Sequence, residues 1–249
     1  MKVALVEFLN AVPLYYALKE GLIENDFEFI SDVPSHCARL LYKKEVDISN
    51  ASIVEYVNSD EYRILRDGCI STTKKVKSVV FFLYKPINRI KTVKLDKNSR
   101  TSNALAKVLF TYKYKVTVDY VFDGRADCEL VIGDRALKRL KSKSKTIDLA
   151  VEWHEFTGLP FVFAAWITNR KLDEDVVDKF LMAKEMGKNL IDEICREYRK
   201  VAKSNECKNY LTQNISYDLS EEKKESIDTF FDFAYRCHAI KRKRNLLFI

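Results

Sequence analysis

The sequence predicts a two-lobed α/β protein, and three observations support this. Short runs of β-branched and aromatic residues alternate with helical stretches through the first two thirds of the chain, as in βα units with a largely parallel sheet. The 249 residues exceed the length of a typical single domain. No Gly/Ser-rich linker, internal repeat or low-complexity segment interrupts the sequence, so we do not expect one flexible tether between the lobes.

The individual elements follow this alternation. We expect strands at residues 2–7, 27–31, 48–51, 79–84, 92–95, 117–122 and 130–132. We expect helices at residues 13–20, 35–44, 53–58, 101–112 and 134–140. Beyond residue 172 the strand signal fades, and apolar residues at helical spacing predict two C-terminal helices, at residues 175–199 and 220–241.

Two crossings between the lobes are expected, which together form a double hinge. The sequence places them near residues 85–86 and 166–170. The first lobe is then discontinuous, with residues 1–85 and 169–249, and the second lobe consists of residues 86–168.

The composition is that of an ordinary globular protein, with 47% hydrophobic and 32% charged residues. No window approaches the roughly 20 apolar residues of a membrane span, so we expect no membrane association. Glu7 and Asn10 interrupt the apolar N-terminus, and no small-residue cleavage pattern follows. We therefore interpret this segment as a first buried strand and expect a cytoplasmic protein.

Neither the cysteines nor the histidines indicate a metal site. The six cysteines contain no C-x-x-C pair, which disfavours a zinc site and a thioredoxin-like motif. We expect reduced, mostly buried thiols, as is usual in the cytoplasm. His36, His154 and His238 each lie apart from other metal-type ligands in the sequence.

The formal net charge is +7, and much of it lies in two basic runs, residues 138–145 and 241–244. Such runs can bind nucleic acid. No basic motif with interleaved aromatic residues accompanies them, so we interpret them as solvated surface and expect no nucleic-acid partner. A positive field would also attract a small dianion.

The strongest local feature is the segment of residues 95–102, a strand end followed by hydroxyl residues that open a helix. The free N–H groups and the positive end of the helix dipole make such a turn suitable for a carboxylate or phosphate. Ser99, Thr101 and Ser102 could add hydroxyl donors, and Arg100 a charge. Simple helix capping explains the same residues equally well.

Other strand-end turns repeat this arrangement. Gly133 would let the backbone approach a ligand, whereas Asp134 also suits an N-cap. The turn at residues 47–52 places polar side chains at the end of another strand, and Asn10 follows the first strand. Because such turns converge at the carboxyl ends of strands, they jointly predict a binding crevice. Ser78 precedes an apolar run. Its hydroxyl is either buried with a hydrogen-bond partner inside the protein or functional.

Six segments together resemble the menaquinone-biosynthesis chorismate dehydratase family of the futalosine pathway. They run in order through about two thirds of the chain: FLNAVPLYYAL from Phe8, VPSHCARLL from Val33, SNASIVEY from Ser49, SRTSNAL from Ser99, VIGDRAL from Val131 and TGLPFVFAAW from Thr157. The resemblance implies a periplasmic-binding-protein-like fold of type II, used as an enzyme without a metal or organic cofactor. The implied reaction converts chorismate to 3-[(1-carboxyvinyl)oxy]benzoate and water.

The resemblance also assigns roles to residues. It implies that Asn10 and Ser78 are catalytic and that Ser52, Ser99, Thr101 and Ser102 bind carboxylates; we add Arg100, Gly133 and Asp134 as substrate-binding candidates. These turns lack an evident strong general base apart from Asp134, so we hypothesise that the enolpyruvyl carboxylate of the substrate takes the proton.

Two alternatives remain open at this point. One is the related dihydroxynaphthoate synthase of the same pathway, whose N-terminal motif differs from FLNAVP. The other is a non-catalytic solute-binding protein for a small carboxylate, which the absence of an export signal disfavours.

Overall fold

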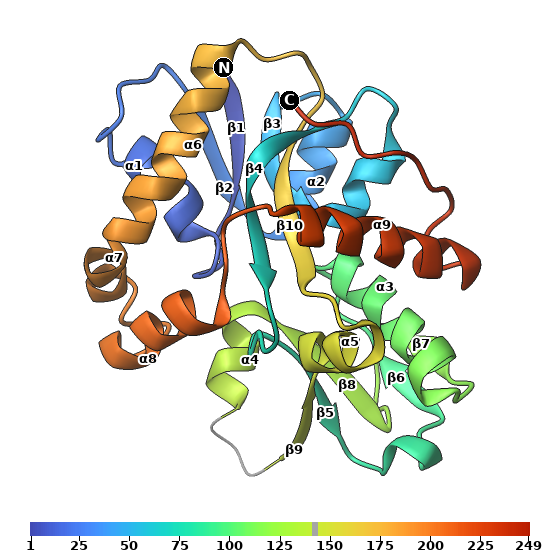
Figure 1. Ribbon diagram of the computed structural model, residues 1–249. Helices are drawn as coiled ribbons and strands as arrows, with labels where there is room; N and C mark the ends of the chain where they lie inside the picture. The colour runs from blue at the N-terminus through green and yellow to red at the C-terminus, as the bar shows by residue number, and fades with distance from the viewer. Residues whose placement is uncertain (141–143) are drawn as a thin grey trace.

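The computed structural model describes residues 1–140 and 144–249 and contains two five-stranded sheets in that part of the chain (Figure 1). The first has the order β2-β1-β3-β10-β4 and the second β7-β6-β8-β5-β9. The strands are β1 (Lys2–Val6), β2 (Glu28–Asp32), β3 (Ile48–Ser52), β4 (Arg63–Thr72), β5 (Val79–Leu83), β6 (Thr92–Lys94), β7 (Asp119–Val121), β8 (Cys128–Ile132), β9 (Lys145–Asp148) and β10 (Phe161–Thr168). The predicted two-lobed α/β architecture is confirmed.

Both sheets share one mixed plan. Three neighbouring strands are parallel, β2-β1-β3 in one sheet and β7-β6-β8 in the other. One antiparallel strand follows, β10 or β5, and the last strand, β4 or β9, pairs antiparallel with it and so runs in the direction of the first three. The prediction of a largely parallel sheet therefore holds, since four of the five strands in each sheet run in one direction. Strands β4, β9 and β10 were not predicted; β4 and β9 contain many polar residues, which obscure the strand pattern.

The chain crosses between the sheets earlier than predicted. It leaves the first sheet after β4 and enters the second at β5, and it returns between α5 (Leu149–Thr157) and β10. The predicted crossings near residues 85–86 and 166–170 thus come after β5 and β10, so each strand belongs to the opposite sheet from the one expected. The hydrophobic run of a strand reports that it is buried, but not which sheet it joins.

The helices predicted in the first two thirds are present, with α5 and the short η3 (Ile87–Arg89) as additions. The helical elements in this part are η1 (Val12–Leu14), α1 (Tyr16–Lys19), α2 (Pro34–Tyr42), η2 (Ile53–Asn58), η3 (Ile87–Arg89), α3 (Arg100–Val108), η4 (Leu109–Tyr114), α4 (Gly133–Arg139) and α5. The C-terminal third is more broken than the two predicted helices. It consists of α6 (Glu174–Asn189), α7 (Ile191–Glu197), α8 (Ser204–Asn209), η5 (Tyr210–Asn214) and α9 (Glu221–Arg236).

One hydrophobic core cluster takes in residues from both sheets. Strand β5 contributes to this core and to a second, smaller cluster. Val79 and Phe81 join the core, whereas Val80 and Phe82 pack in the smaller cluster with Val131, because successive side chains of a strand point to opposite faces. Helix α9 packs against both β10 and α3 and therefore lies across the two sheets (Figure 1). No helix among the described residues is long and apolar enough to cross a lipid bilayer.

The C-terminal basic run is tied to the protein surface. Arg242 pairs with Asp60, Lys243 with Asp232, and Arg244 lies over the ring of Tyr56. Residues 247–249 then hydrogen-bond to the free edge of β4, which covers an exposed sheet edge. These contacts support the interpretation of this run as protein surface. The other run, residues 138–145, lies partly outside the described residues, and the expectation of no nucleic-acid partner stays a prediction.

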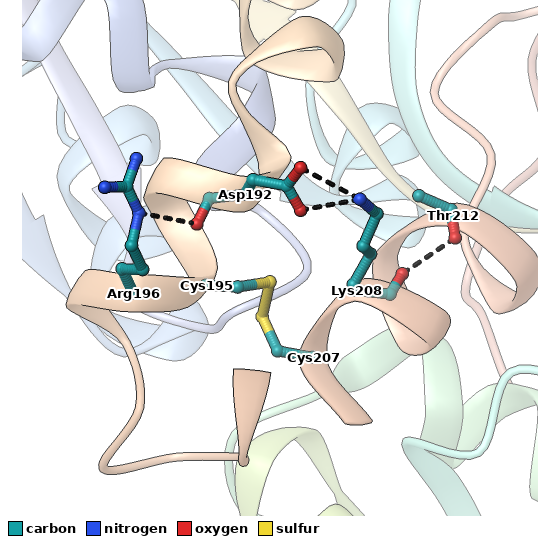
Figure 2. The surroundings of a disulfide bond; sticks show 6 residues. All are labelled: Asp192, Cys195, Arg196, Cys207, Lys208 and Thr212. Atoms are coloured by element: carbon teal, nitrogen blue, oxygen red, sulfur yellow. Dashed lines mark hydrogen bonds and ion pairs between the residues drawn. A yellow bond between two sulfur atoms is a disulfide. The ribbon is translucent and has the colours of Figure 1, made fainter. Parts of the chain in front are cut away.

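The expectation of reduced thiols is wrong for one pair. Cys195 of α7 and Cys207 of α8 form a disulfide, and an ion pair between Asp192 and Lys208 joins the same two helices (Figure 2). Cys37, Cys69 and Cys128 are free and buried, and Cys237 is free and half-buried. The pairing depends on how α7 and α8 pack side by side, which cysteine spacing does not reveal.

Candidate functional site

A cavity of about 50 Å³ lies between the two sheets. Its walls come from the loop after β1, the end of β3, the start of β5, the N-terminus of α3, the turn into α4 and strand β10. No charged side chain lines it in the part of the chain that the structure describes. The lining residues are Val6, Phe8, Asn10, Pro34, Asn50, Ser52, Ile70, Ser78, Val79, Ser99, Ser102, Ile132, Gly133, Phe163 and Ala164.

Of the nine residues predicted to form the site, six line this cavity. They are Asn10, Ser52, Ser78, Ser99, Ser102 and Gly133. They lie up to 123 positions apart in sequence. The fold brings them together because each lies at or near the end of a strand, where the two sheets face each other.

The first lobe contributes two amides. The Oδ1 atom of Asn50 accepts the N–H of Val6 at 2.8 Å. Because that N–H requires an acceptor, the orientation of the amide is fixed, and its Nδ2 is buried without a partner among the described residues. The Oδ1 of Asn10 is likewise buried and unpaired there. A buried polar atom left unpaired costs about 1–3 kcal/mol, so both amides are suited to a ligand.

The second lobe contributes a pair of hydroxyls at the start of α3. Ser99 caps this helix, because its Oγ accepts the N–H of Ser102 at 3.1 Å. The same Oγ also donates to the Oγ of Ser102, 2.9 Å away. The first N–H groups of an α-helix have no acceptor within it and carry the positive end of its dipole. Capping and anion binding are therefore compatible at this turn.

Ser78 lies at the end of the first crossover and is buried. Its carbonyl accepts the N–H of Gly133 at 2.8 Å, and its Oγ accepts the hydroxyl of Tyr210 at 2.7 Å. Gly133 has a φ of +61°, and a Cβ there would lie 3.0 Å from the ring of Phe8. Glycine is thus required by the backbone and by the close ring, while its N–H is already used by Ser78.

The other three predicted residues do not line the cavity, and this corrects the sequence-based assignment of their side chains. Arg100 pairs with Glu55 at 3.1 Å, and its side chain is largely exposed. The Oγ1 of Thr101 accepts the N–H of Val54 at 3.2 Å. Asp134 accepts the N–H of Leu9 at 3.2 Å.

These three interactions share one consequence. Each connects a residue of the second lobe, at α3 or α4, to a residue of the first lobe, in η2 or the loop after β1. Burial raises the pKa of Glu55 despite the nearby Arg100, and burial raises the pKa of Asp134 despite the N–H of Leu9. The residues form ties between the lobes around the cavity.

Of the polar residues at the site, Asn50 was predicted only as part of the turn at residues 47–52, and Tyr210, which hydrogen-bonds to Ser78, was not predicted. Asn50 lies at the centre of β3, whose five residues are all buried. A polar side chain in the middle of a predicted strand could therefore have identified it from the sequence. No such sequence signal pointed to Tyr210, because it lies in the C-terminal third, far from the recognised motifs. Phe163 lies in TGLPFVFAAW, one of the six segments that carry the family resemblance, and it forms part of the cavity wall.

The arrangement combines neutral hydrogen-bonding groups with an apolar wall of Phe8, Ile70 and Phe163. Neutral amides, hydroxyls and helix N–H groups can bind carboxylates and orient a hydroxyl, while the apolar wall accommodates a ring. Ligand pockets commonly measure about 300–1,000 Å³, so a ring with two carboxylates requires the lobes to separate before it enters.

Comparison with known proteins agrees with these features. Residues 1–236 match a family model described as menaquinone biosynthesis. The chain is 30% identical over 234 residues to a chorismate dehydratase of Campylobacter jejuni, covering 90% of this chain and 93% of that protein.

Solved structures share the fold. A crystal structure of an Archaeoglobus fulgidus protein has a TM-score of 0.79 at 19% identity and covers 96% of this chain and 98% of the other. A Candida albicans gene product, described as exhibiting the generic periplasmic binding protein fold, has a TM-score of 0.68 at 14% identity, with 98% and 92% covered. The predicted periplasmic-binding-protein-like fold is confirmed.

Proposed function

Because the chain belongs to the menaquinone-biosynthesis family, we propose that it is a chorismate dehydratase, a carbon–oxygen lyase that converts chorismate to 3-[(1-carboxyvinyl)oxy]benzoate and water. The observation that carries this proposal is the cavity itself. It joins unpaired amide atoms of Asn10 and Asn50 to the hydroxyls of Ser78, Ser99 and Ser102 against an apolar wall.

The second lobe is the proposed site of the substrate carboxylates. Ser99 and Ser102 supply hydroxyls at the start of α3, and Ser52 faces them from β3. Arg100 and Thr101 would contribute their backbone N–H groups in the first turn rather than their side chains. The positive end of the helix dipole favours an anion at this position.

The reaction itself removes the C3 proton and the C4 hydroxyl. The C–H electron pair becomes a ring double bond as the C–O bond breaks, and the ring becomes aromatic. This provides a large driving force, so the protein mainly orients the leaving hydroxyl and stabilises developing charge. In our proposal the enolpyruvyl carboxylate takes the C3 proton, which then leaves with the hydroxide as water, while Asn10 and Ser78 hold the reacting groups.

Lobe closure is part of the proposed mechanism. The form with a cavity of about 50 Å³ is closed more tightly than a bound substrate would allow, and the ties Arg100–Glu55, Thr101–Val54 and Asp134–Leu9 would break on opening. Closure excludes water and completes the site. We expect small-angle scattering to show a larger radius of gyration for the free protein than for the protein with product. Identical curves would contradict closure.

Incubation of the purified protein with chorismate tests the function directly. We expect an aromatic absorption spectrum and a product whose mass is that of chorismate less one water. A solute-binding protein would bind chorismate and return it unchanged. The dihydroxynaphthoate synthase alternative predicts no consumption of chorismate.

We also propose a cytoplasmic location for this enzyme, although the Cys195–Cys207 disulfide is unusual in that compartment. Rapid alkylation of thiols in lysed cells, followed by mass analysis, measures the state of this pair. Full alkylation of both cysteines would indicate that the disulfide forms only after lysis.

A further inference from the structure

We propose that Tyr210 is a positioning residue that fixes the hydroxyl of Ser78 as a hydrogen-bond donor toward the leaving hydroxyl of the substrate. This inference rests on the proposed dehydratase function. Tyr210 does not line the cavity between the sheets; it lies directly behind Ser78 and borders a separate hollow beside β9 and α8. It therefore acts through Ser78 rather than on the substrate.

The direction of one hydrogen bond carries the argument. The hydroxyl oxygens of Tyr210 and Ser78 lie 2.7 Å apart, and the phenol donates to the Oγ of Ser78 because it is the more acidic of the two hydroxyls. A serine hydroxyl has one proton and two acceptor lone pairs. With one lone pair occupied by Tyr210, the proton of Ser78 is free to point into the cavity that Ser78 lines. A donor in that position is what a departing hydroxyl requires.

The environment of Tyr210 keeps it a donor. Its ring is buried, and burial raises the pKa of its phenol, so the proton is retained wherever the protein is folded. A phenol that keeps its proton can go on donating to the Oγ of Ser78.

The C-terminal segment holds Tyr210 in place from both sides. Tyr210 is the first residue of η5, which follows α8, and α8 is joined to α7 by the Cys195–Cys207 disulfide (Figure 2). At the other end of η5, the Nδ2 of Asn214 donates to the carbonyl of Lys75 at 3.0 Å. The same turn therefore fixes both the hydroxyl of Ser78 and the crossover segment on which Ser78 lies.

The test compares Tyr210→Phe with Tyr217→Phe in the full chain. Both residues are buried tyrosines of the same segment, but the hydroxyl of Tyr217 has no partner among the described residues. We expect Tyr210→Phe to lower kcat for chorismate by about tenfold, the effect of one lost hydrogen bond of about 1.4 kcal/mol, with KM changed less than about twofold. Tyr217→Phe should leave both constants near those of the wild type.

A double-mutant comparison separates positioning from structure. In a Ser78→Ala background, Tyr210→Phe should have no further effect on kcat, because the residue it positions is gone. An additive loss would overturn the inference. Should Tyr210→Phe not fold, 3-fluorotyrosine at position 210 keeps the shape and strengthens the donor. A change in kcat at constant KM then supports the inference, and an unchanged kcat contradicts it.

The outcomes distinguish the two proposals. Turnover by the wild type with an unchanged Tyr210→Phe variant leaves the dehydratase function in place and removes only the role of Tyr210. A wild-type protein that does not consume chorismate overturns both.

Discussion

The two lobes have the same strand plan but present different chemistry to the cavity. In the first lobe, the turn after β1 carries Asn10 and leads into the three-residue η1; in the second, the corresponding turn after β6 carries Ser99 and leads into α3. Likewise, the turn after β3 with Ser52 corresponds to the turn after β8 with Gly133. The two lobes therefore place corresponding turns on opposite sides of the cavity.

What differs is the helix that follows. A regular α-helix has free N–H groups and a dipole at its start, and α3 offers both, whereas η1 is too short to do so. The first lobe instead offers side-chain amides. The comparison indicates that the second lobe binds the carboxylates and that the first lobe, with Ser78 at the crossover, orients the reacting groups.

The largest expected effect is on turnover, at the crossover and the first lobe. Asn10→Asp or Ser78→Ala should lower kcat by about 100-fold or more, as loss of a group that contacts the transition state does. Binding should change far less. Steady-state kinetics with folding checked by circular dichroism measure this, and unchanged turnover would reject the assigned roles.

The packing behind the Asn10 loop gives the next largest effect. A Cβ on Gly187 of α6 would come within 1.9 Å of the carbonyl oxygen of Pro13. Pro13 lies in η1, the short helix that follows the Asn10 loop. Overpacking of this kind costs about 1–3 kcal/mol. Gly187→Ala should lower the free energy of unfolding in urea by that amount and lower kcat as well. Full activity in this variant would show that the first-lobe loop need not be held in place.

The serines of the second lobe should affect binding rather than turnover. Ser102→Ala is expected to raise KM by about tenfold, the loss of one hydrogen bond to a charged group, with kcat little changed. Ser99→Ala serves as the comparison, because it should also cost about 1 kcal/mol of stability through loss of the N-cap. A fall in kcat alone would contradict the division of roles between the lobes.

The smallest effect concerns Asp134, which ties the lobes together. Burial raises the pKa of its carboxyl in the folded protein above the unfolded value of about 3.9. Ionisation therefore weakens folding above the folded-state pKa, and this penalty disappears below about pH 4. Asp134→Asn keeps an oxygen for the N–H of Leu9 and should be more stable than the wild type at pH 7 but not at pH 3.5. Urea unfolding at both pH values measures this, and a stability difference independent of pH would contradict it.

Local signals in the sequence predicted more of the site than of the sheets. Ser99 and Ser102 were found because hydroxyls before a helix have a defined role, and Asn10 and Ser78 were found through the family motifs. Strand β4 was missed because its polar residues obscure the strand pattern, even though seven of its ten residues are buried.

The sequence by itself determined the α/β class, most strand and helix positions and six of the residues that line the cavity, because these depend on periodicity, capping and short motifs. Only the tertiary structure decided which sheet β5 and β10 join, that Arg100, Thr101 and Asp134 connect the lobes, that Cys195 pairs with Cys207 and that Tyr210 reaches Ser78. Each of these depends on the direction of a side chain or strand relative to a distant segment, and local pattern does not encode that direction.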